Sequence, residues 1–302
     1  MNPTWHVAEW CSFRGVGHTA GWVRGVSDVG VVHGLRQLGT WPGRAPQGAV
    51  AAPGDAVAFA LSFRLPSEAT MDAVALIATD PDGERHRLDD PLSVGLADDP
   101  YHRLWPRFRE LLAADAPGRL LQVGARGERT EQLLAELPTG WTHVGLDIRP
   151  GPNVDVVGDG HALRRALGRR ERFDAVVSLS VFEHLAMPWK VVLELNAVLR
   201  DGGLVLVETH QTFPLHEVPW DYWRYSNDTW FALFNPATGF VVEEVAMGEP
   251  AAIVPRFSHA IVADNEHGQA FLGAGVIARR IGRTRLRWDV ARDDVIANSY
   301  PS

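Results

Sequence analysis

Residues 173–210 read FDAVVSLSVFEHLAMPWKVVLELNAVLRDGGLVLVETH, and this stretch decides the fold. Short aliphatic runs at 175–179 and 204–207 are typical of parallel strands that are covered on both faces. Between them, apolar residues recur at helical spacing after Pro188, which suits a first helical turn. Gly202 and Gly203 should end this helix and start the second strand. The stretch therefore predicts a strand–helix–strand unit with a right-handed crossover.

Polar side chains gather just after the two predicted strands. They are Ser178, Ser180, Glu183, His184, Thr209 and His210. Open α/β sheets bind their ligands in the crevice outside the carboxyl ends of the strands. We therefore expect these residues to border a ligand site.

Composition narrows the class of protein. The chain has 302 residues and a net charge of −8, which argues against nucleic acid as the main partner. Its single cysteine, Cys11, excludes an intrachain disulfide framework and fits a reducing cytoplasm. The first residues lack the basic start and apolar core of a secretory signal. No stretch approaches the roughly 20 apolar residues that span a bilayer, so we expect a cytoplasmic protein with no membrane partner.

The sequence has two regions with different secondary-structure patterns, which predict two domains. Residues 1–98 show short strand-like runs between Gly, Pro and Asp turns, as in a small all-β sandwich. Those runs are 21–26, 29–33, 56–64 and 73–79. After the linker at 97–100, residues 99–302 begin with a predicted amphipathic helix at 101–114.

Strand and helix patterns alternate from residue 119 onward. The predicted strands are 120–123, 142–146, 154–157, 240–246 and 271–281, and the predicted helices are 129–137 and 162–167, in addition to the 173–210 unit. Such alternation implies a doubly wound, mostly parallel sheet, so the fold class is α/β and Rossmann-like.

Three segments form a candidate cofactor half. The first strand runs into the loop Gly124-Ala125-Arg126-Gly127, where glycines allow close backbone approach and a helix N-terminus follows. Asp147 ends the second strand, where a carboxylate can accept both ribose hydroxyls. Asp159 and Gly160 follow the third strand and open a helix. Each feature has an ordinary structural explanation, but together they fall at one edge of the sheet.

The segments LLQVGARGE, HVGLDIRPG, VVGDGHAL, FDAVVSLSVFEHL and ELNAVLRDGGLVLVETH, in this order, resemble a class I S-adenosylmethionine-dependent methyltransferase. The similarity spans about 120–281 and implies a seven-stranded methyltransferase sheet. By this resemblance the cofactor would contact the loop, both carboxylates and the end of the fourth strand. The residues so assigned are Gly124, Ala125, Arg126, Gly127, Asp147, Ile148, Asp159, Gly160, Ser178, Leu179 and Ser180.

Two positions depart from the family pattern. Gln122 stands where an acidic residue is usual, and Arg126 stands where the second loop glycine is usual. The chain is also similar to bacterial methyltransferases of glycan and natural-product pathways, which share a Gly-small-Arg loop and a Thr-His stretch like that at 209–224. That similarity favours an altered loop that still binds the cofactor, rather than a degenerate binding or scaffold module.

The acceptor half supplies candidate catalytic groups. Methyl transfer to a hydroxyl requires a positioned acceptor and removal of its proton, and histidine is the usual base near neutral pH. His184 and His210 follow neighbouring strands, and we group Asp221 with them as catalytic. Glu-His at 183–184 also fits an ordinary hydrogen-bonded helix entry, so the choice between the two histidines stays open.

The aromatic stretch that follows suggests a carbohydrate acceptor. Aromatic rings interleaved with charged and His side chains are typical of sugar sites, although the same stretch could form a packed cap. The predicted substrate residues are His216, Glu217, Trp220, Trp223 and Arg224. We therefore expect O-methylation of a sugar, glycan or glycosylated natural product. The alternative is a small-molecule O- or N-methyltransferase without sugar specificity.

No metal is assigned to the site. Suitable ligand types occur, but no recognised spacing such as H-E-x-x-H is present, so a divalent metal is not favoured. An NAD-dependent oxidoreductase is disfavoured because G-x-G-x-x-G is absent. The N-terminal sandwich would position a large acceptor or mediate a homodimer.

Overall fold

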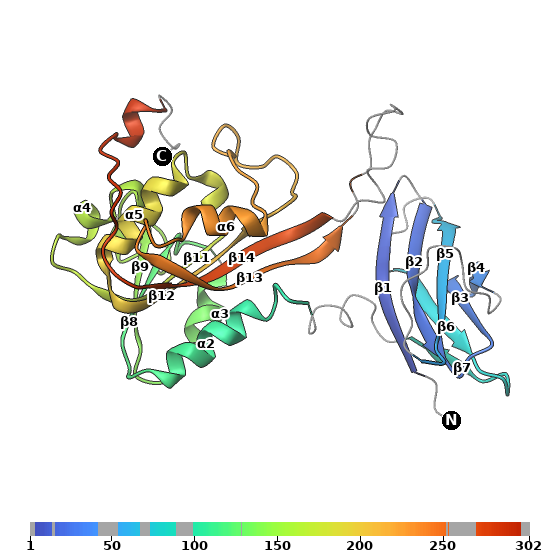
Figure 1. The fold of residues 1–302 in the computed structure, drawn as a ribbon. Coiled ribbons are helices and arrows are strands. Elements are labelled where there is room, and N and C mark those ends of the chain that lie inside the picture. Colours follow the sequence, from blue (N-terminus) through green and yellow to red (C-terminus); the bar gives the residue numbers. More distant parts are fainter. Residues whose placement is uncertain are drawn as a thin grey trace. The chain divides into compact units, whose positions relative to one another are not determined.

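The computed structural model describes residues 4–13, 16–41, 54–66, 73–88, 99–127, 129–251, 253 and 270–296. The chain divides into two compact units, Met1–Asp98 and Asp99–Ser302. Figure 1 shows the elements of each unit. Cys11 lies in a strand of the first unit, and no helix among the described residues is long and apolar enough to cross a membrane.

The first unit is built from two antiparallel sheets. One sheet has the order β1 (Thr4–Phe13), β2 (Val16–Arg24), β5 (Val57–Arg64), and the other has the order β4 (Arg36–Trp41), β3 (Asp28–His33), β6 (Ala75–Thr79), β7 (Arg85–Arg87). Both sheets contribute buried side chains to one core, for example Phe59 from the first and Leu76 from the second. Burial alternates along β5, as expected of a strand with one face on a core. The sandwich architecture was expected from the spacing of the strand-like runs.

The second unit contains a seven-stranded sheet with helices on both faces (Figure 1). Its strand order is β10 (Val156–Val157), β9 (Thr142–Asp147), β8 (Arg119–Val123), β11 (Phe173–Leu179), β12 (Leu199–His210), β14 (Ala270–Arg280), β13 (Phe240–Ala251). The first five strands pair in parallel, and β14 is antiparallel to both of its neighbours. The predicted mostly parallel, doubly wound sheet is confirmed.

Alternate residues of the central strands face two separate cores. Helices α2 (Leu104–Ala114) and α3 (Arg129–Glu136) cover one face, where they pack with residues such as Val177. Helices α4 (Leu163–Leu167), α5 (Pro188–Val198) and α6 (Asn227–Leu233) cover the other face. Both faces of the strands are thus buried, which explains their almost continuous aliphatic sequence.

One local expectation is wrong. Helix α5 ends at Val198 and strand β12 begins at Leu199, so Gly202 and Gly203 lie inside the strand rather than at its start. Gly202 has φ of +83°, and the pairing of β12 with β11 is interrupted there. The glycines therefore provide a bend within β12, because the left-handed backbone is readily adopted only by glycine.

The sheet order reverses between β8 and β11. Strands β9 and β10 lie on one side of β8, whereas β11 and β12 lie on the other. This reversal creates a crevice at the carboxyl ends of β8 and β11, because the connections leave in opposite directions.

Candidate functional site

A cavity of about 490 Å³ lies at this reversal point. Its volume falls in the usual range of sites for small molecules and cofactors. Eleven of the predicted site residues line it: Gly124, Arg126, Gly127, Asp147, Ile148, Asp159, Gly160, Leu179, Ser180, His184 and Glu217. The structure therefore brings the three cofactor segments together with one predicted catalytic histidine and one predicted substrate residue.

The loop after β8 turns sharply at Gly124. Its φ is +87°, and a Cβ there would come within 2.2 Å of Val181 Cγ2. The backbone N–H groups of Gly124 and Ala125 both donate to the carbonyl oxygen of Leu146, at 2.8 and 3.2 Å. These contacts bind the loop to the end of β9. The positive φ and the closeness of Val181 each require glycine at position 124.

Asp147 ends β9 with its carboxylate already oriented. The backbone N–H of Arg149 donates to Oδ1 at 3.0 Å, and that of Arg126 donates to Oδ2 at 3.3 Å. The Arg126 guanidinium lies beside it, with Nε 3.9 Å from Oδ1. The Asp147 side chain is 13% exposed and reaches the cavity. It is placed to accept hydrogen bonds from a ribose.

Asp159 lies at the opposite side of the cofactor half and caps the short helix η2 (Gly160–Ala162). Its Oδ1 accepts the backbone N–H of His161 at 2.9 Å and lies 2.7 Å from His161 Nδ1. Burial opposes its ionisation, but the contacts with His161 outweigh burial and hold the pKa of Asp159 below its usual value. His161 Nε2 accepts the N–H of Met187, so Nδ1 carries the ring proton of a neutral His161.

Gln122 and Arg126, the two departures from the family pattern, have defined contacts. The Gln122 amide donates to Thr130 Oγ1 at 2.8 Å, and its carbonyl oxygen lies 3.0 Å from His143 Nε2. Gln122 therefore ties β8 to α3 and β9 while it lines the cavity. The side chain of Arg126 lies against Gly151, where a Cβ would come within 2.7 Å of Arg126 Cγ.

Two residues expected at the cofactor lie outside the lining of the cavity. Ser178 is 1% exposed, and its hydroxyl donates to the carbonyl oxygen of Val123 at 3.1 Å. Ala125 is fully buried. Strand alternation explains the first case, because neighbouring residues of β11 face opposite sides of the sheet. The structure thus places Ser178 and Ala125 behind the lining residues of the cavity.

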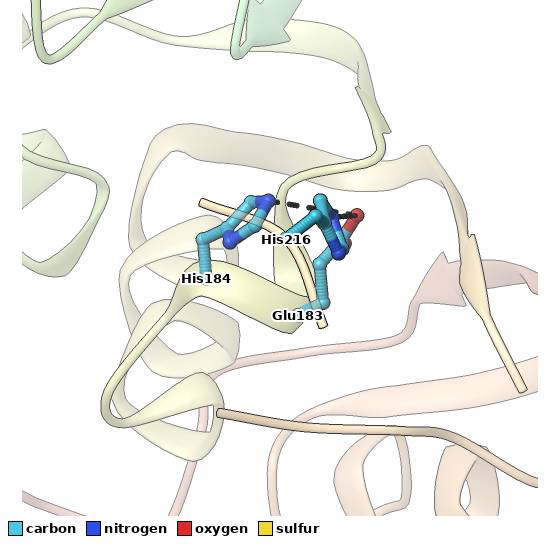
Figure 2. A group of neighbouring side chains, drawn as sticks. All are labelled: Glu183, His184 and His216. Atoms are coloured by element: carbon cyan, nitrogen blue, oxygen red, sulfur yellow. Dashed lines mark ion pairs between the residues drawn. The ribbon is translucent and has the colours of Figure 1, made fainter. Parts of the chain in front are cut away.

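A second set of side chains surrounds the carboxylate of Glu183. Glu183 and His184 belong to the short helix η3 (Phe182–His184) after β11, and His210 ends β12. Oε1 of Glu183 lies 3.1 Å from His210 Nε2, 3.9 Å from His184 Nε2 and 3.9 Å from His216 Nε2. Figure 2 shows Glu183, His184 and His216 turned toward one another. We call Glu183, His184, His210 and His216 the Glu–His cluster.

The Glu183 side chain is 0% exposed. Burial opposes its ionisation, but the His210 ring and the Thr209 hydroxyl outweigh burial and hold the pKa of Glu183 below its usual value. Glu183 is therefore an anion near neutral pH. Its charge makes it an anchor for the rings rather than a proton acceptor.

Hydrogen bonds attach segment 211–226 to the residues of this cluster. Backbone N–H groups of Tyr222 and Trp223 donate to the carbonyl oxygen of Glu183, and that of Tyr225 donates to His210. His184 Nδ1 donates to the carbonyl oxygen of Trp220 at 3.0 Å. These bonds place His216, which is remote in sequence from η3, beside Glu183 and His184.

Asp221, predicted to be catalytic, is paired with Arg224 outside the lining of the cavity. Arg224 donates to both of its oxygens, at 2.5 and 2.8 Å, and the Asp221 side chain is 0% exposed. Arg224 is the main reason that the pKa of Asp221 lies far below its usual value. Because Asp221 stays ionised and does not line the cavity, it is a poor proton acceptor. It instead accepts the backbone N–H of His216 at 3.0 Å.

The remaining predicted acceptor residues are mostly used within segment 211–226. Arg224 also donates to the carbonyl oxygen of Phe213, and Trp223 donates its indole N–H to that of Leu185. Trp220 is 9% exposed, whereas Trp223 is 38% exposed. Neither tryptophan nor Arg224, His210 or His216 lines the cavity itself.

Sequence reasoning missed several residues of the lining. They are Val123, Arg129, Thr130, Leu146, Arg149, Gly158, His161, Val181, Leu185, Arg292 and Ile296, besides Gln122. Most of them directly neighbour the predicted segments, so adjacency could have found them. Arg292, whose Nη1 lies 3.4 Å from Asp159 Oδ2, had no such signal because it comes from the far C-terminal segment.

Comparison with known proteins gave a family match and several similar solved structures. Residues 96–238 match a family described as "Methyltransferase domain". A SAM-dependent methyltransferase from Archaeoglobus fulgidus is 16% identical, covering 60% of this chain and 94% of that one, with a TM-score of 0.42. The 1,6-didemethyltoxoflavin N1-methyltransferase of Burkholderia thailandensis, solved with that substrate and S-adenosylhomocysteine, is 15% identical, covering 69% and 96%, with a TM-score of 0.43. No curated protein matches.

The family match covers the segments that form the cavity from β8 to β12. Those segments supply the loop and the two carboxylates that the resemblance in sequence assigned to the cofactor, and the strand order reverses between them. Residues 96–238 therefore carry a methyltransferase domain.

Proposed function

We propose that this domain methylates an oxygen, namely a hydroxyl of a sugar, a glycan or a glycosylated natural product. When bound, S-adenosylmethionine supplies a methyl group on a sulfonium, which the acceptor oxygen takes by in-line displacement with release of S-adenosylhomocysteine and one proton. The chain must hold the cofactor, orient the acceptor and remove that proton.

The residues around the cavity suit the cofactor. Asp147 is oriented by two backbone N–H groups and can accept from ribose hydroxyls. Asp159 and Gly160 border the same cavity on the side suited to the adenine. Two carboxylates provide acceptors for a nucleoside that is rich in hydroxyl and amino donors. Gln122, already bonded to Thr130 and His143, offers no charge to the cofactor's ammonium group.

The observation that carries the proposal is the position of His184. It lines the cofactor cavity and also belongs to the Glu–His cluster. Its Nδ1 donates to Trp220, so Nε2 carries the lone pair on the cluster side. The cluster is therefore the group placed to promote loss of the proton from an acceptor hydroxyl, and Asp221 positions His216 within it.

Aromatic exposure supports a sugar as the acceptor. Phe213 is 40% exposed and stacks on His210 with ring centroids 4.1 Å apart, and Trp223 is 38% exposed. Flat aromatic faces of this kind suit the apolar faces of sugar rings, and nearby polar groups suit their hydroxyls.

Residues 1–98 would then serve as an accessory domain that positions a large acceptor or pairs two copies of the chain. Their separate core supports this division of roles. Removal of residues 1–98 should lower turnover of large acceptors or abolish a dimer, and an unchanged enzyme would contradict this role.

Methyl-labelled S-adenosylmethionine tests the proposed reaction directly. The chain is incubated with glycosides that carry free hydroxyls and, separately, with amines that lack them. Label should enter the glycosides as an acid-stable methyl ether. Transfer to the amines alone would instead establish an N-methyltransferase and overturn the proposal.

A further inference from the structure

Three ligand atoms of the Glu–His cluster meet in one place. Glu183, His184 and His216 each offer one ligand atom, and these atoms lie within 4.8 Å of one another; Oε1 of Glu183 is 3.9 Å from Nε2 of each histidine. Figure 2 shows the two imidazole rings directed at the carboxylate from different chain segments. Such convergence of two imidazoles and one carboxylate is a donor set that divalent transition metals favour.

The second observation is the hydrogen bonding behind each ring. His184 Nδ1 donates to the carbonyl oxygen of Trp220 at 3.0 Å. His216 Nδ1 lies 3.2 Å from the carbonyl oxygen of Pro214 and 3.4 Å from Oδ2 of Asp221. Both rings are thus held as Nδ1–H tautomers with the Nε2 lone pair directed at the cluster. Metal-binding histidines characteristically donate their other ring N–H to a carbonyl or carboxylate.

The third observation is the state of Glu183. Its side chain is 0% exposed, and among the described residues no hydrogen bond of regular geometry reaches Oε1, although His210 Nε2 lies 3.1 Å away. A buried carboxylate oxygen needs compensation by a donor or a cation. The neighbouring nitrogens of His184 and His216, at 3.9 Å, are too distant to donate to it.

We propose that Glu183, His184 and His216 bind one divalent transition-metal ion, of which Zn²⁺ is the type. Metal bonds of about 2.0–2.2 Å place tetrahedral ligands about 3.4 Å apart. The 3.9 Å separations from Glu183 Oε1 to the two Nε2 atoms therefore need to close by about half an ångström. Three protein ligands leave a position for water or a substrate oxygen.

The ion deepens the proposed function, on which its catalytic use rests. His184 lines the cofactor cavity, so the ion would lie at the wall of that cavity. A bound divalent ion lowers the pKa of a coordinated hydroxyl. The acceptor hydroxyl then loses its proton to solvent, its oxygen bonds to the methyl carbon, and the carbon–sulfur bond breaks with its electron pair going to sulfur.

The test uses the full chain without an affinity tag, after dialysis against EDTA. Titration with Co²⁺ should produce visible d–d absorption that saturates at one ion per chain and is displaced by Zn²⁺. His216→Ala and Glu183→Gln should each weaken binding at least tenfold, and Asp221→Asn should weaken it about 10- to 100-fold through the His216 ring.

A matched control comes from the first unit. Asp80, Glu84 and His86 form another group of potential ligands there, and His86 Nε2 lies 3.0 Å from Asp80 Oδ2. His86→Ala should leave the cobalt spectrum and affinity unchanged. Loss of the signal in His86→Ala, with no change in His216→Ala, would place the ion in the first unit and overturn the proposal.

Titration with S-adenosylhomocysteine separates this proposal from the function. A variant that keeps this binding is folded, so its loss of cobalt binding is specific. If a variant does not fold, X-ray absorption of the cobalt-loaded wild type tests the site instead. The account predicts scattering from two imidazole ligands, and a spectrum without imidazole scattering would contradict the site. If the chain binds cobalt but not S-adenosylhomocysteine, the metal site stands and the proposed methyltransferase function is contradicted. If it binds S-adenosylhomocysteine but not cobalt, the proposed function stands and the metal site is contradicted.

Discussion

Asp221 and His216 are joined twice, by a backbone N–H of His216 that donates to Asp221 Oδ2 at 3.0 Å and by His216 Nδ1 at 3.4 Å from the same oxygen. Arg224 neutralises this carboxylate by donating to both of its oxygens. The pair fixes the direction of the His216 ring and so completes the Glu–His cluster. A residue expected to act on the acceptor thus acts through another side chain.

Stability should depend on pH through these carboxylates. Asp221 and Glu183 have pKa values below the ordinary ones, so they stabilise the fold above their unfolded values of about 4 and lose that contribution as pH falls. Urea unfolding of wild type and Asp221→Asn should show the wild type as more stable at pH 7, with the difference narrowing toward acid pH. Asp228→Asn, at an exposed position, is the control. Parallel curves for wild type and Asp221→Asn would refute the role of the ion pair.

Asp147→Ala should weaken binding of S-adenosylhomocysteine about 10- to 100-fold. The reason is the loss of hydrogen bonds to a charged acceptor, each contributing about 1.5–3 kcal/mol. Isothermal titration measures the effect, and Glu110→Gln, at an exposed helix position, is the matched control. Equal affinity for Asp147→Ala and wild type would remove Asp147 from the cofactor site.

Gly124→Ala should destabilise the second unit by about 1–3 kcal/mol, because alanine is strained at φ of +87° and its Cβ meets Val181. Gly127→Ala is the comparison within the same loop, since a Cβ there meets nothing within 4 Å. It should change stability by no more than about 0.5 kcal/mol. Thermal unfolding without ligand compares the two variants, and similar melting temperatures would contradict the account of the loop.

His210→Ala should lower turnover far more than it lowers affinity for S-adenosylhomocysteine. His210 Nε2 lies 3.1 Å from Glu183 Oε1 but does not line the cofactor cavity. Rates with saturating cofactor and a methyl acceptor, together with the titration, separate the two effects. Unchanged turnover would leave His210 without a role in the reaction.

The sequence predicted the parts of the site that local patterns determine. Asp147 ends β9, Asp159 follows the short strand β10, and His184 follows β11. Their meeting at one edge follows from the parallel sheet. Ser178 does not line the cavity, because strand alternation directs its side chain to the face opposite that of Leu179.

The missed features depend on contacts between distant segments. Backbone bonds to Glu183 and His210 set the conformation of segment 211–226, and these bonds decide that His216 joins the cluster while Arg224 is used by Asp221. Arg292 reaches Asp159 from the C-terminal segment. No periodicity or motif spacing encodes such contacts.

A crystal structure of the chain with S-adenosylhomocysteine tests the central claim most directly. The account predicts ribose hydroxyls within hydrogen-bond distance of Asp147, the adenine beside Asp159 and Gly160, and the sulfur on the side of the cavity bounded by His184. A sulfur directed away from His184, or a ligand outside this cavity, would contradict the claim that the methyl donor faces the Glu–His cluster.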